Sequence, residues 1–490
     1  MLFNTLDFII FFAIIVGSIS FFRFRNFQHI LIIVSSLYFL FYTDNFLVTL
    51  LISTILLHFY IGRGIYKSKD PKIRKIFLIV GILGSLSLLG FFKYYDFAIT
   101  QFNIFGNLLN LENQIPLLNL ALPIGISFYT FQSLSYIIDI YRGHLTPTKS
   151  LKEYAFFVAF FPSLVSGPIL RASHFLPQLK EKIGQAKSSG RLRLFIIQNS
   201  ALKFGISLMV IGFFKKIVFA DNVAPLVNNI FSNPIGMESF AIILGSIAFG
   251  IQVYCDFSGY SDIAIGAAAI LGFKIPLNFN KPFFATSPSD FWSRWHISLS
   301  SWVRDYLYFP LAWKHRRSSV IIFSSLLFSM LLMGLWHGAS WNFLIWGGLH
   351  GIFLAVFTVI RKKYSKPVEP FFKSKIGKFF SIFVTQYLVF FTFIAFVVQD
   401  FDHMWYAMKK YVILDFTTSQ TIEIINENEF AILLIILFVI LHYVSYRLGN
   451  LPEKISKLKL RYWVLFLIFI ILPISLFYVG SAQEFIYFQF

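Results

Sequence analysis

The sequence has a single cysteine, Cys255, among its 490 residues. One thiol excludes an internal disulfide and a metal site built from cysteines. Cys255 lies in an apolar run beside Asp256, which predicts a buried packing residue, with a catalytic thiol as the alternative. The sequence also has no P-loop and no Gly-x-Ser-x-Gly turn, so nucleoside triphosphatases and serine hydrolases lack support.

Charged residues are scarce as well. They make up 13% of the chain, against about 25% in a soluble domain. Hydrophobic residues make up 57%, and phenylalanine alone accounts for 64 residues. This composition predicts an all-α polytopic membrane protein. The net charge of +19 comes from basic residues in short loops, where they orient membrane spans, so we expect no nucleic-acid partner.

Apolar runs give the positions of the spans. A membrane-spanning helix needs about 20 apolar residues, which predicts about 11–13 transmembrane helices in one integral-membrane domain, residues 1–490. The expected spans are 7–22, 28–43, 46–62, 76–93, 121–141, 201–220, 238–256, 318–336, 341–360, 378–399, 430–447 and 462–480. No basic segment precedes the first run, so we expect a first span with its N-terminus outside, and not a cleaved signal peptide.

Loop charges predict the orientation of the chain in the cytoplasmic membrane. Residues 63–75, 361–378 and 447–461 are rich in lysine and arginine and should be cytoplasmic. Residues 400–429 are acidic and should be external. Lys215 and Lys216, near the outer end of their span, do not fit this scheme.

Two segments are expected to be re-entrant. The first is the apolar run that follows Lys152 and ends at Pro168, before the basic stretch that begins at Arg171; it contains helix breakers at Phe161–Ser163 and Ser166–Pro168. The second is residues 263–280, where Lys274 and Lys281 flank a short Gly-rich helix. Broken backbone at membrane depth survives where protein or a water-filled cavity covers it.

Ionisable groups at membrane depth are concentrated between Tyr254 and Gly351. Such groups are rare in membrane spans unless a pathway or a reaction uses them. Asp256 and Asp262 could line a polar channel, or they could belong to a junction of two helices capped by nearby serines, Ser258 and Ser261. The cluster as a whole predicts an active site within the bilayer.

Residues 291–306 have the pattern of an amphipathic helix lying in the membrane interface. One face would carry Trp292, Trp295, Leu299, Trp302 and Tyr306, and the opposite face Arg294, Ser298, Ser301 and Asp305. His296 borders the aromatic face and should point into the protein. A structural interfacial helix with a hydrogen-bonded histidine is the alternative.

His337 is the sharpest catalytic candidate. It lies between Trp336 and Gly338, where small residues leave room for a substrate. Imidazole is the usual group for moving a proton near neutral pH. The alternative is a histidine bonded to a neighbouring carbonyl, and His350 is interpreted as a packing or supporting residue. His296, His337 and His350 lack the spacing of a helical ligand pair, so no metal site is expected.

Several of these motifs resemble the membrane-bound O-acyltransferase superfamily, and within it the bacterial alginate O-acetyltransferases and D-alanyl transfer proteins. The resemblance rests on residues 291–300 and 304–308, Trp336-His337-Gly338, Leu122–Phe128, Phe161–Pro168 and Phe214–Asn222. It covers about residues 121–351, the expected catalytic core. Pro310 is followed by Leu311-Ala312-Trp313, where relatives acting on alginate tend to have a Gly-rich loop, so the acceptor is left open.

The resemblance implies transfer of an acyl group, most often acetyl, to a hydroxyl of an extracytoplasmic polysaccharide or cell-envelope acceptor. His337 matches the family's catalytic histidine, His296 matches one that often joins it, and Lys215 and Lys216 belong to a recurring motif. The donor would be acetyl-CoA or another acyl thioester from the cytoplasm, and no cofactor would stay bound. An accessory extracytoplasmic esterase-like protein could assist.

A central tunnel would connect the two sides of the membrane. Residues that could line it are Arg294, Trp292, Trp336, Asp256, Asp262, Arg304 and Asp305. Two other classes of protein stay open. A proton-coupled transporter or flippase of envelope precursors would use the two aspartates and the histidines as a relay, and a scaffold of a polysaccharide export complex would need no such relay. No inverted repeat is evident, which weakens the transporter interpretation.

Overall fold

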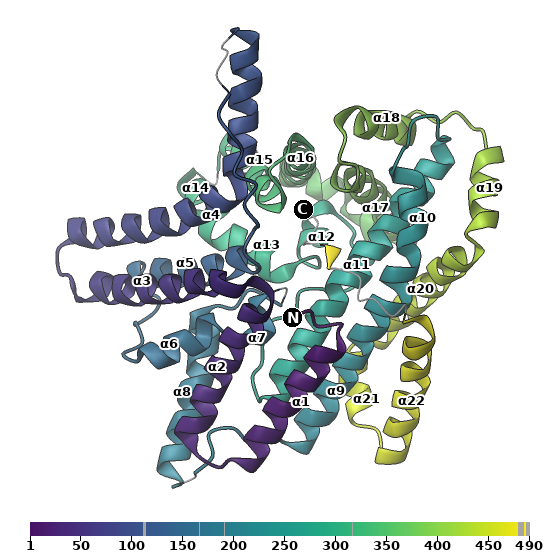
Figure 1. Cartoon of the computed structure of the whole chain (residues 1–490). Helices are drawn as coiled ribbons and strands as arrows, with labels where there is room; N and C mark the ends of the chain where they lie inside the picture. The colour runs from purple at the N-terminus through teal and green to yellow at the C-terminus, as the bar shows by residue number, and fades with distance from the viewer. Residues whose placement is uncertain (111–113, 166, 191, 316, 479–484, 487–490) are drawn as a thin grey trace. The chain divides into compact units, whose positions relative to one another are not determined.

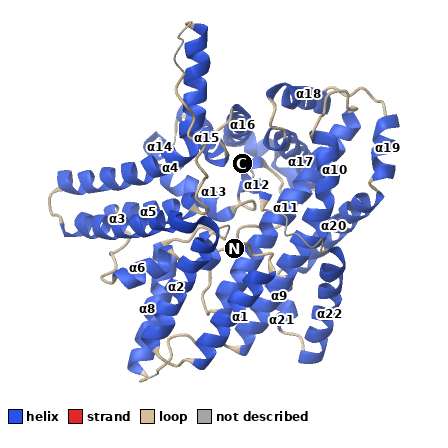
Figure 2. Ribbon diagram, in the orientation of Figure 1, coloured by secondary structure: helices blue, strands red, loops and turns tan. Residues whose placement is uncertain are grey.

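The structure is a computed structural model that describes residues 1–110, 114–165, 167–190, 192–315, 317–478 and 485–486. Helices are the regular secondary structure of these residues (Figure 2). Eight helical stretches among them are long and apolar enough to span a membrane. The prediction of an all-α polytopic membrane protein is therefore confirmed.

The expected spans correspond to observed helices. Residues 28–43 and 46–62 fall within one apolar stretch, Arg25–Lys67, and residues 7–22 match the shorter apolar helix Leu6–Phe21. Residues 121–141 and 201–220 overlap helices of 16 residues each. Ser166 of the first expected re-entrant segment, and residues 479–480 of the last expected span, lie outside the described residues.

The chain divides into two compact units. The first comprises Met1–Met209 and Ile263–Pro276. Its helices are α1 (Leu6–Phe21), α2 (Arg25–Asp44), α3 (Val48–Lys67), α4 (Pro71–Leu108), α5 (Ile126–Tyr141), α6 (Leu151–Val158), α7 (Phe161–Leu164), α8 (Ala172–Ser188) and the first part of α9 (Asn199–Phe214). Within it, α3, α4 and α5 pack on one another (Figure 1).

The sharp turn between α3 and α4 follows from local sequence. Asp70 accepts a hydrogen bond from the backbone N–H of Lys72 and thereby caps α4. Pro71 occupies the first turn, where its missing N–H and its fixed φ suit a helix start. These two residues bring the chain straight back into a second long apolar helix.

The second unit comprises Val210–Asp262 and Leu277–Phe490. After the π-helical segment η2 (Lys215–Ala220), its helices are α10 (Asp221–Phe231), α11 (Ser239–Ile270, ending in the first unit), α12 (Pro288–Trp292), α13 (Ile297–Val303), α14 (Phe309–Ala312), α15 (Ser319–His337), α16 (Trp341–Lys373), α17 (Lys375–Val397), α18 (Phe401–Val412), α19 (Ser419–Glu427), α20 (Glu429–Leu448), α21 (Leu451–Ser456) and α22 (Leu460–Phe477). Short segments η3 (Pro282–Phe284), η4 (Arg304–Tyr308) and η5 (Trp313–His315) lie between them, and η1 (Asn45–Leu47) lies in the first unit.

The short separate helix expected within residues 263–280 is not formed. Residues 263–270 continue α11, an uninterrupted helix of 32 residues. Close helix packing explains the glycines that prompted the prediction, because a Cβ on Gly266 would lie 2.6 Å from the carbonyl oxygen of Gly205 on α9. These glycines let two helices approach and do not break one of them.

Glycines also bring α15 and α16 into close contact. A Cβ on Gly334 would overlap the carbonyl oxygen of Phe343, and a Cβ on Gly347 would overlap that of Met330. The two helix backbones can pack so closely because both positions are glycine, which has no side chain. The α15–α16 hairpin is therefore closely packed near its turn.

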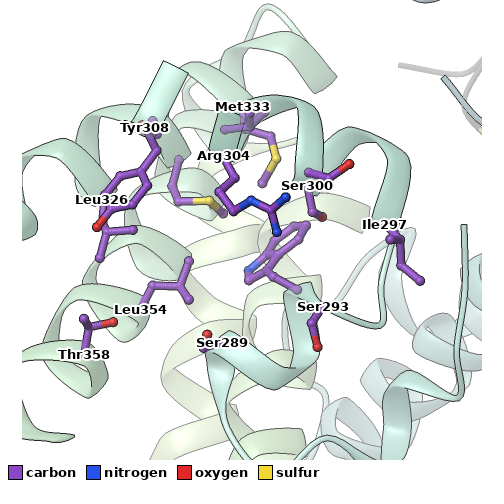
Figure 3. A pocket seen from close by; sticks show the side chains of 15 residues that line it. Ser289, Ser293, Ile297, Ser300, Arg304, Tyr308, Leu326, Met333, Leu354 and Thr358 are labelled. Atoms are coloured by element: carbon purple, nitrogen blue, oxygen red, sulfur yellow. The ribbon is translucent and has the colours of Figure 1, made fainter. Parts of the chain in front are cut away.

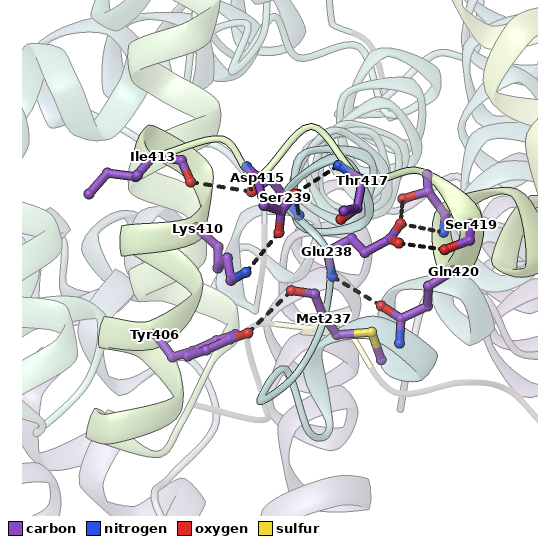
Figure 4. Close-up of polar contacts among 11 residues, drawn as sticks. Met237, Glu238, Ser239, Tyr406, Lys410, Ile413, Asp415, Thr417, Ser419 and Gln420 are labelled. Carbon is purple, nitrogen blue, oxygen red and sulfur yellow. Dashed lines mark hydrogen bonds and ion pairs between the residues drawn. The ribbon is translucent and has the colours of Figure 1, made fainter.

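A polar clasp joins the segment before α11 to the connection between α18 and α19 (Figure 4). Glu238 accepts hydrogen bonds from the hydroxyl and the N–H of Thr421, each at 2.9 Å, and from the Ser419 hydroxyl at 3.0 Å. Asp415 forms an ion pair with Lys410 at 2.7 Å. Asp415 also accepts a hydrogen bond from the backbone N–H of Ser239 at 3.3 Å, so one acid of the segment expected outside the membrane helps to hold this unit together.

Candidate active site

His337 is the last residue of α15. The helix ends there because Gly338 takes an extended conformation, and a side chain at Gly338 would overlap the ring of Phe343. The imidazole is 6% exposed and is surrounded by aromatic rings. Its centroid lies 4.6 Å from that of Trp336, 4.8 Å from that of Trp346 and 5.2 Å from that of Phe396.

The beginning of α16 is tied to the end of α17 beside this histidine. The side-chain amide of Asn342 donates hydrogen bonds to the carbonyl oxygens of Val398, at 2.6 Å, and Gln399, at 2.9 Å. Asn342 is buried, so both bonds are protected from water. The aromatic wall of His337 is thus fixed from two helices.

His296 also lies near Trp336. Its ring is completely buried, with its centroid 4.6 Å from that of Phe257 and 6.1 Å from that of Trp336. Burial lowers the pKa of the His296 imidazole to about 3, so the ring is neutral at physiological pH. The sequence prediction that His296 points into the protein is confirmed. The two histidines thus both pack near one indole, that of Trp336.

The predicted single helix over residues 291–306 is wrong. The chain forms α12 and α13 with a break between them, and at this break His296 has a φ of 42°. Asn278 holds the turn: it accepts a hydrogen bond from the Ser298 hydroxyl at 2.6 Å, and its amide donates to the Ser261 hydroxyl at 3.1 Å.

The tryptophans of this segment are buried in the protein and do not form the exposed aromatic face that was predicted. Trp292, Trp295 and Trp302 are all less than 9% exposed. The break at His296 turns the rings into the protein, where they pack on other helices; Trp295, for example, lies 5.7 Å from Phe393 of α17. The aromatic pattern therefore reflects a core and not a lipid-facing stripe.

Two ion-pair systems occupy the start of the second unit. Lys215 lies 2.6 Å from Asp262, with side chains 24% and 17% exposed. Lys216 lies 2.7 Å from Asp256 and 2.8 Å from Asp221, and the side chains of Lys216 and Asp256 are at most 3% exposed. These ion pairs explain why Lys215 and Lys216 lie at the end of an apolar run, a position that the distribution of charge among the loops did not explain.

The predicted helix junction at Asp256 and Asp262 is also wrong, since α11 runs through both residues. Both acids instead fasten α11 to the segment that follows α9. Asp256 has a further partner, because the backbone N–H of Ile486 donates to its second oxygen at 2.7 Å. Phe485 is fully buried next to it, 4.5 Å from the ring of Tyr260.

A pocket of about 450 Å³ is lined by residues of the α12–α13 segment, η4, α15 and α16 (Figure 3). Arg304 lies among its lining side chains, which include the hydroxyls of Ser289, Ser293, Ser300 and Ser301. Trp292 and apolar residues of α15 and α16 form the rest of the wall. A cation, several hydroxyls and an apolar lining suit an elongated ligand with a polar end.

Other predicted residues have structural partners. Arg294 pairs with Asp290 at 2.7 Å, one turn earlier, and Arg304 pairs with the adjacent Asp305 at 2.8 Å. Among the described residues, no three His, Cys, Asp or Glu side chains are grouped so that they could hold a metal ion.

The family of the chain follows from comparison with known proteins. The family model "MBOAT, membrane-bound O-acyltransferase family" matches residues 142–399, more than half of the chain. The chain belongs to this family. The matched region contains both histidines and both ion-pair systems.

Similar proteins are known from several bacteria. A peptidoglycan O-acetyltransferase of Helicobacter pylori is 34% identical over 354 residues, covering 67% of this chain and 64% of that protein. A probable alginate O-acetylase of Pseudomonas aeruginosa is 37% identical over 337 residues, covering 68% and 61%. A teichoic acid D-alanyltransferase of Bacillus subtilis is 29% identical over 297 residues, covering 58% and 71%. The matches thus span less than two thirds of the length of the first two relatives.

In this membrane-bound O-acyltransferase, sequence reasoning missed the residues that hold the site in place. Asn278, Asn342 and Thr392 are buried polar side chains that bridge separate segments. A polar residue inside an apolar run is the only sequence signal for them, because such a group must find a partner when it is buried.

Proposed function

We propose that this protein transfers an acyl group, most simply acetyl, from a cytoplasmic thioester to a hydroxyl of a polysaccharide or other cell-envelope acceptor outside the cytoplasmic membrane. Membership of the membrane-bound O-acyltransferase family supports this proposal. The relatives' names support it further, since they describe O-acetyl transfer to peptidoglycan, O-acetylation of alginate and D-alanyl transfer to teichoic acid.

The observation that carries the proposal is the packing of His337 and His296 near the same indole, that of Trp336, with centroid distances of 4.6 Å and 6.1 Å. They come from helix segments about 40 residues apart and are enclosed by aromatic rings. A proton-transfer group in such a water-poor site is expected where a reactive acyl donor must be kept from hydrolysis.

In the proposed reaction, a nitrogen of the His337 imidazole takes the proton of the acceptor hydroxyl. The hydroxyl oxygen then attacks the thioester carbonyl, and the oxyanion that forms is stabilised by the neutral His296 ring or by a backbone dipole. When the carbon–sulfur bond breaks, the leaving thiolate takes the proton from the His337 imidazolium. The acceptor keeps the acyl group as an ester, and His337 returns to its neutral form.

The pocket lined by Trp292 and Arg304 is proposed to receive the donor. Its volume of about 450 Å³ is in the range of small-molecule sites. Arg304 is more than half exposed, so it can meet a phosphate group of an acyl-CoA or acyl-carrier arm at the mouth of the pocket. The apolar wall from α15 and α16 suits the uncharged part of that arm.

Complementation of a deletion strain tests the proposal. Membranes with equal amounts of wild-type, His337→Ala and His296→Ala protein are compared for ester-linked acetate on envelope polymers, released with mild base and quantified. We expect His337→Ala to reduce acylation by about 10²–10⁴-fold, the usual effect of removing a general base. His296→Ala should reduce it less. His144→Ala, at an exposed loop position, is the matched control. Normal acylation by a well-expressed His337→Ala protein would refute the assignment.

A further inference from the structure

His350, on α16, has its orientation fixed by one hydroxyl. Its Nε2 lies 2.9 Å from the side-chain oxygen of Thr392 on α17. The Thr392 hydroxyl donates its own proton to the carbonyl oxygen of Val389 at 2.7 Å. With its proton directed to Val389, the hydroxyl oxygen is placed to accept a hydrogen bond from the Nε2–H tautomer of His350. His350 is 2% exposed and Thr392 is fully buried, so water does not compete for this bond.

The His350 ring supports two tryptophans. Its centroid lies 4.7 Å from that of Trp346, at an interplanar angle of 67°, and 5.1 Å from that of Trp292, at 75°. Trp346 in turn lies 4.8 Å from His337, at 80°. Trp292 lines the pocket proposed for the donor. His350 thus touches both the wall of the pocket and the ring that packs on the catalytic histidine.

Hydrogen bonding distinguishes His350 from these two indoles. The indole N–H groups of Trp292 and Trp346 are buried and have no hydrogen-bond acceptor among the residues that the structure describes. Their orientation therefore depends on packing, whereas that of His350 is set by the bond to Thr392. A change in that bond is transmitted to both tryptophans, because protein interiors are close-packed and a ring that turns must displace its neighbours.

We propose that Thr392 and His350 are positioning residues for acyl transfer. The Thr392 hydroxyl holds the His350 ring, which keeps Trp346 against His337 and Trp292 against the donor pocket. This inference rests on the proposed function, and it adds two residues, on α16 and α17, that make no contact with the reacting atoms in the mechanism above.

Thr392→Val removes the hydroxyl and keeps the shape of the side chain. The His350 N–H then loses its buried acceptor, and the ring is free to turn toward another one. Because a misplacement of about 1 Å in an active site lowers the rate by about 100-fold, we expect acyl transfer to fall by about 10- to 100-fold. Thr392→Ser restores the hydroxyl and should restore the rate to within about twofold of the wild type.

The first unit offers a matched control. His58 on α3 is also buried, and its Nε2 lies 2.7 Å from the hydroxyl of Ser85 on α4. Ser85→Ala also removes a hydroxyl from a buried histidine, at a pair in the first unit. Here the hydroxyl donates to the ring, because the other ring nitrogen, Nδ1, bonds the carbonyl oxygen of Thr54 at 2.9 Å. The thermal stability of Ser85→Ala should decrease about as much as that of Thr392→Val, while its rate of acyl transfer stays close to that of the wild type.

The experiment measures incorporation of radiolabelled acetate into envelope polymers, per amount of membrane-inserted full-length protein, together with the melting temperature of each purified variant. The inference is supported if acyl transfer is slowed in Thr392→Val but stays close to the wild-type rate in Thr392→Ser and in Ser85→Ala. A wild-type rate for Thr392→Val overturns it, and so does a Thr392→Ser variant as slow as Thr392→Val. If the wild-type protein incorporates no more acetate than the deletion strain, the proposed function itself is refuted, and the inference with it.

Discussion

Asp256 is the most deeply buried acid among the residues that the structure describes, and replacing it with asparagine gives a quantitative test of the ion-pair description. One carboxylate oxygen lies 2.7 Å from the Lys216 ammonium, and the other accepts the N–H of Ile486 at 2.7 Å. Both partners are donors. Asparagine has one acceptor oxygen and one donor nitrogen, so it can keep only one of the two bonds. Its NH₂ group must then face a donor.

The expected loss of stability follows from burial. Removing one partner of a buried ion pair costs about 3–5 kcal/mol, because the other charge is left in a medium of low polarity. Lys216 keeps Asp221, 2.8 Å away, so we expect a value near the lower limit of about 3 kcal/mol for Asp256→Asn. Asp262→Asn is the internal comparison. The Lys215–Asp262 pair is partly exposed, and a single asparagine oxygen can still accept from Lys215, so the loss should be about 1 kcal/mol or less.

The assay is thermal unfolding of each variant in the same detergent, followed by size-exclusion chromatography of the remaining folded protein, with acyl transfer measured in parallel. Asp256→Asn should melt clearly below Asp262→Asn, and both should keep part of the activity that His337→Ala loses. Equal melting temperatures, or a larger loss for Asp262→Asn, would refute the reasoning from hydrogen-bond partners.

Two further predictions concern the second unit. Burial raises the pKa of Glu238, but the hydrogen bonds led by those from Thr421 outweigh burial and lower it below its ordinary value. The stabilisation by the Glu238 carboxylate is therefore complete when the pH is above the ordinary pKa of glutamate, and it is lost as the pH falls through the lowered pKa of Glu238 in the folded protein. We expect Glu238→Gln to melt at a lower temperature than the wild type at pH 7 and at the same temperature near pH 3. The exposed control Glu423→Gln should melt at the wild-type temperature at both pH values. Gly347→Ala should prevent close packing of α15 and α16 and strongly reduce folded protein on chromatography, whereas Gly348→Ala, whose Cβ would meet its nearest neighbour at an ordinary 3.5 Å, should be tolerated.

The spans could be predicted from sequence because a membrane-spanning helix consists of about 20 consecutive apolar residues, a pattern that is visible in one short stretch of the chain. The hairpin of α15 and α16 is a clear case. Two apolar runs separated by Gly338, Ala339 and Ser340 predicted spans 318–336 and 341–360, and α15 ends at His337 while α16 begins at Trp341. The burial of His296 was predicted too, since the residue borders an aromatic face.

The supporting contacts could not be predicted, because they join residues far apart in the chain. Lys215 and Asp262 are 47 positions apart, and no local pattern pairs them. The break at His296 was missed for a related reason: the spacing of the tryptophans fits a helix, but the turn is held by Asn278, which lies outside that segment. An unexplained charge within an apolar span was the available signal, since such a charge needs a partner.

The ion pairs also bear on the choice between an enzyme and a proton-coupled transporter. A relay needs acids that release and regain protons while their surroundings rearrange. Asp256 is bound by an ammonium and an N–H in a fixed geometry, and the adjoining helices are close enough that a Cβ on Gly259 would lie 2.7 Å from the carbonyl oxygen of Gly212. Backbones in such contact cannot slide without a steric clash. The two acids therefore hold α11 to the segment that follows α9, and this favours the proposed mechanism, in which His337 moves the proton, over a relay through the aspartates.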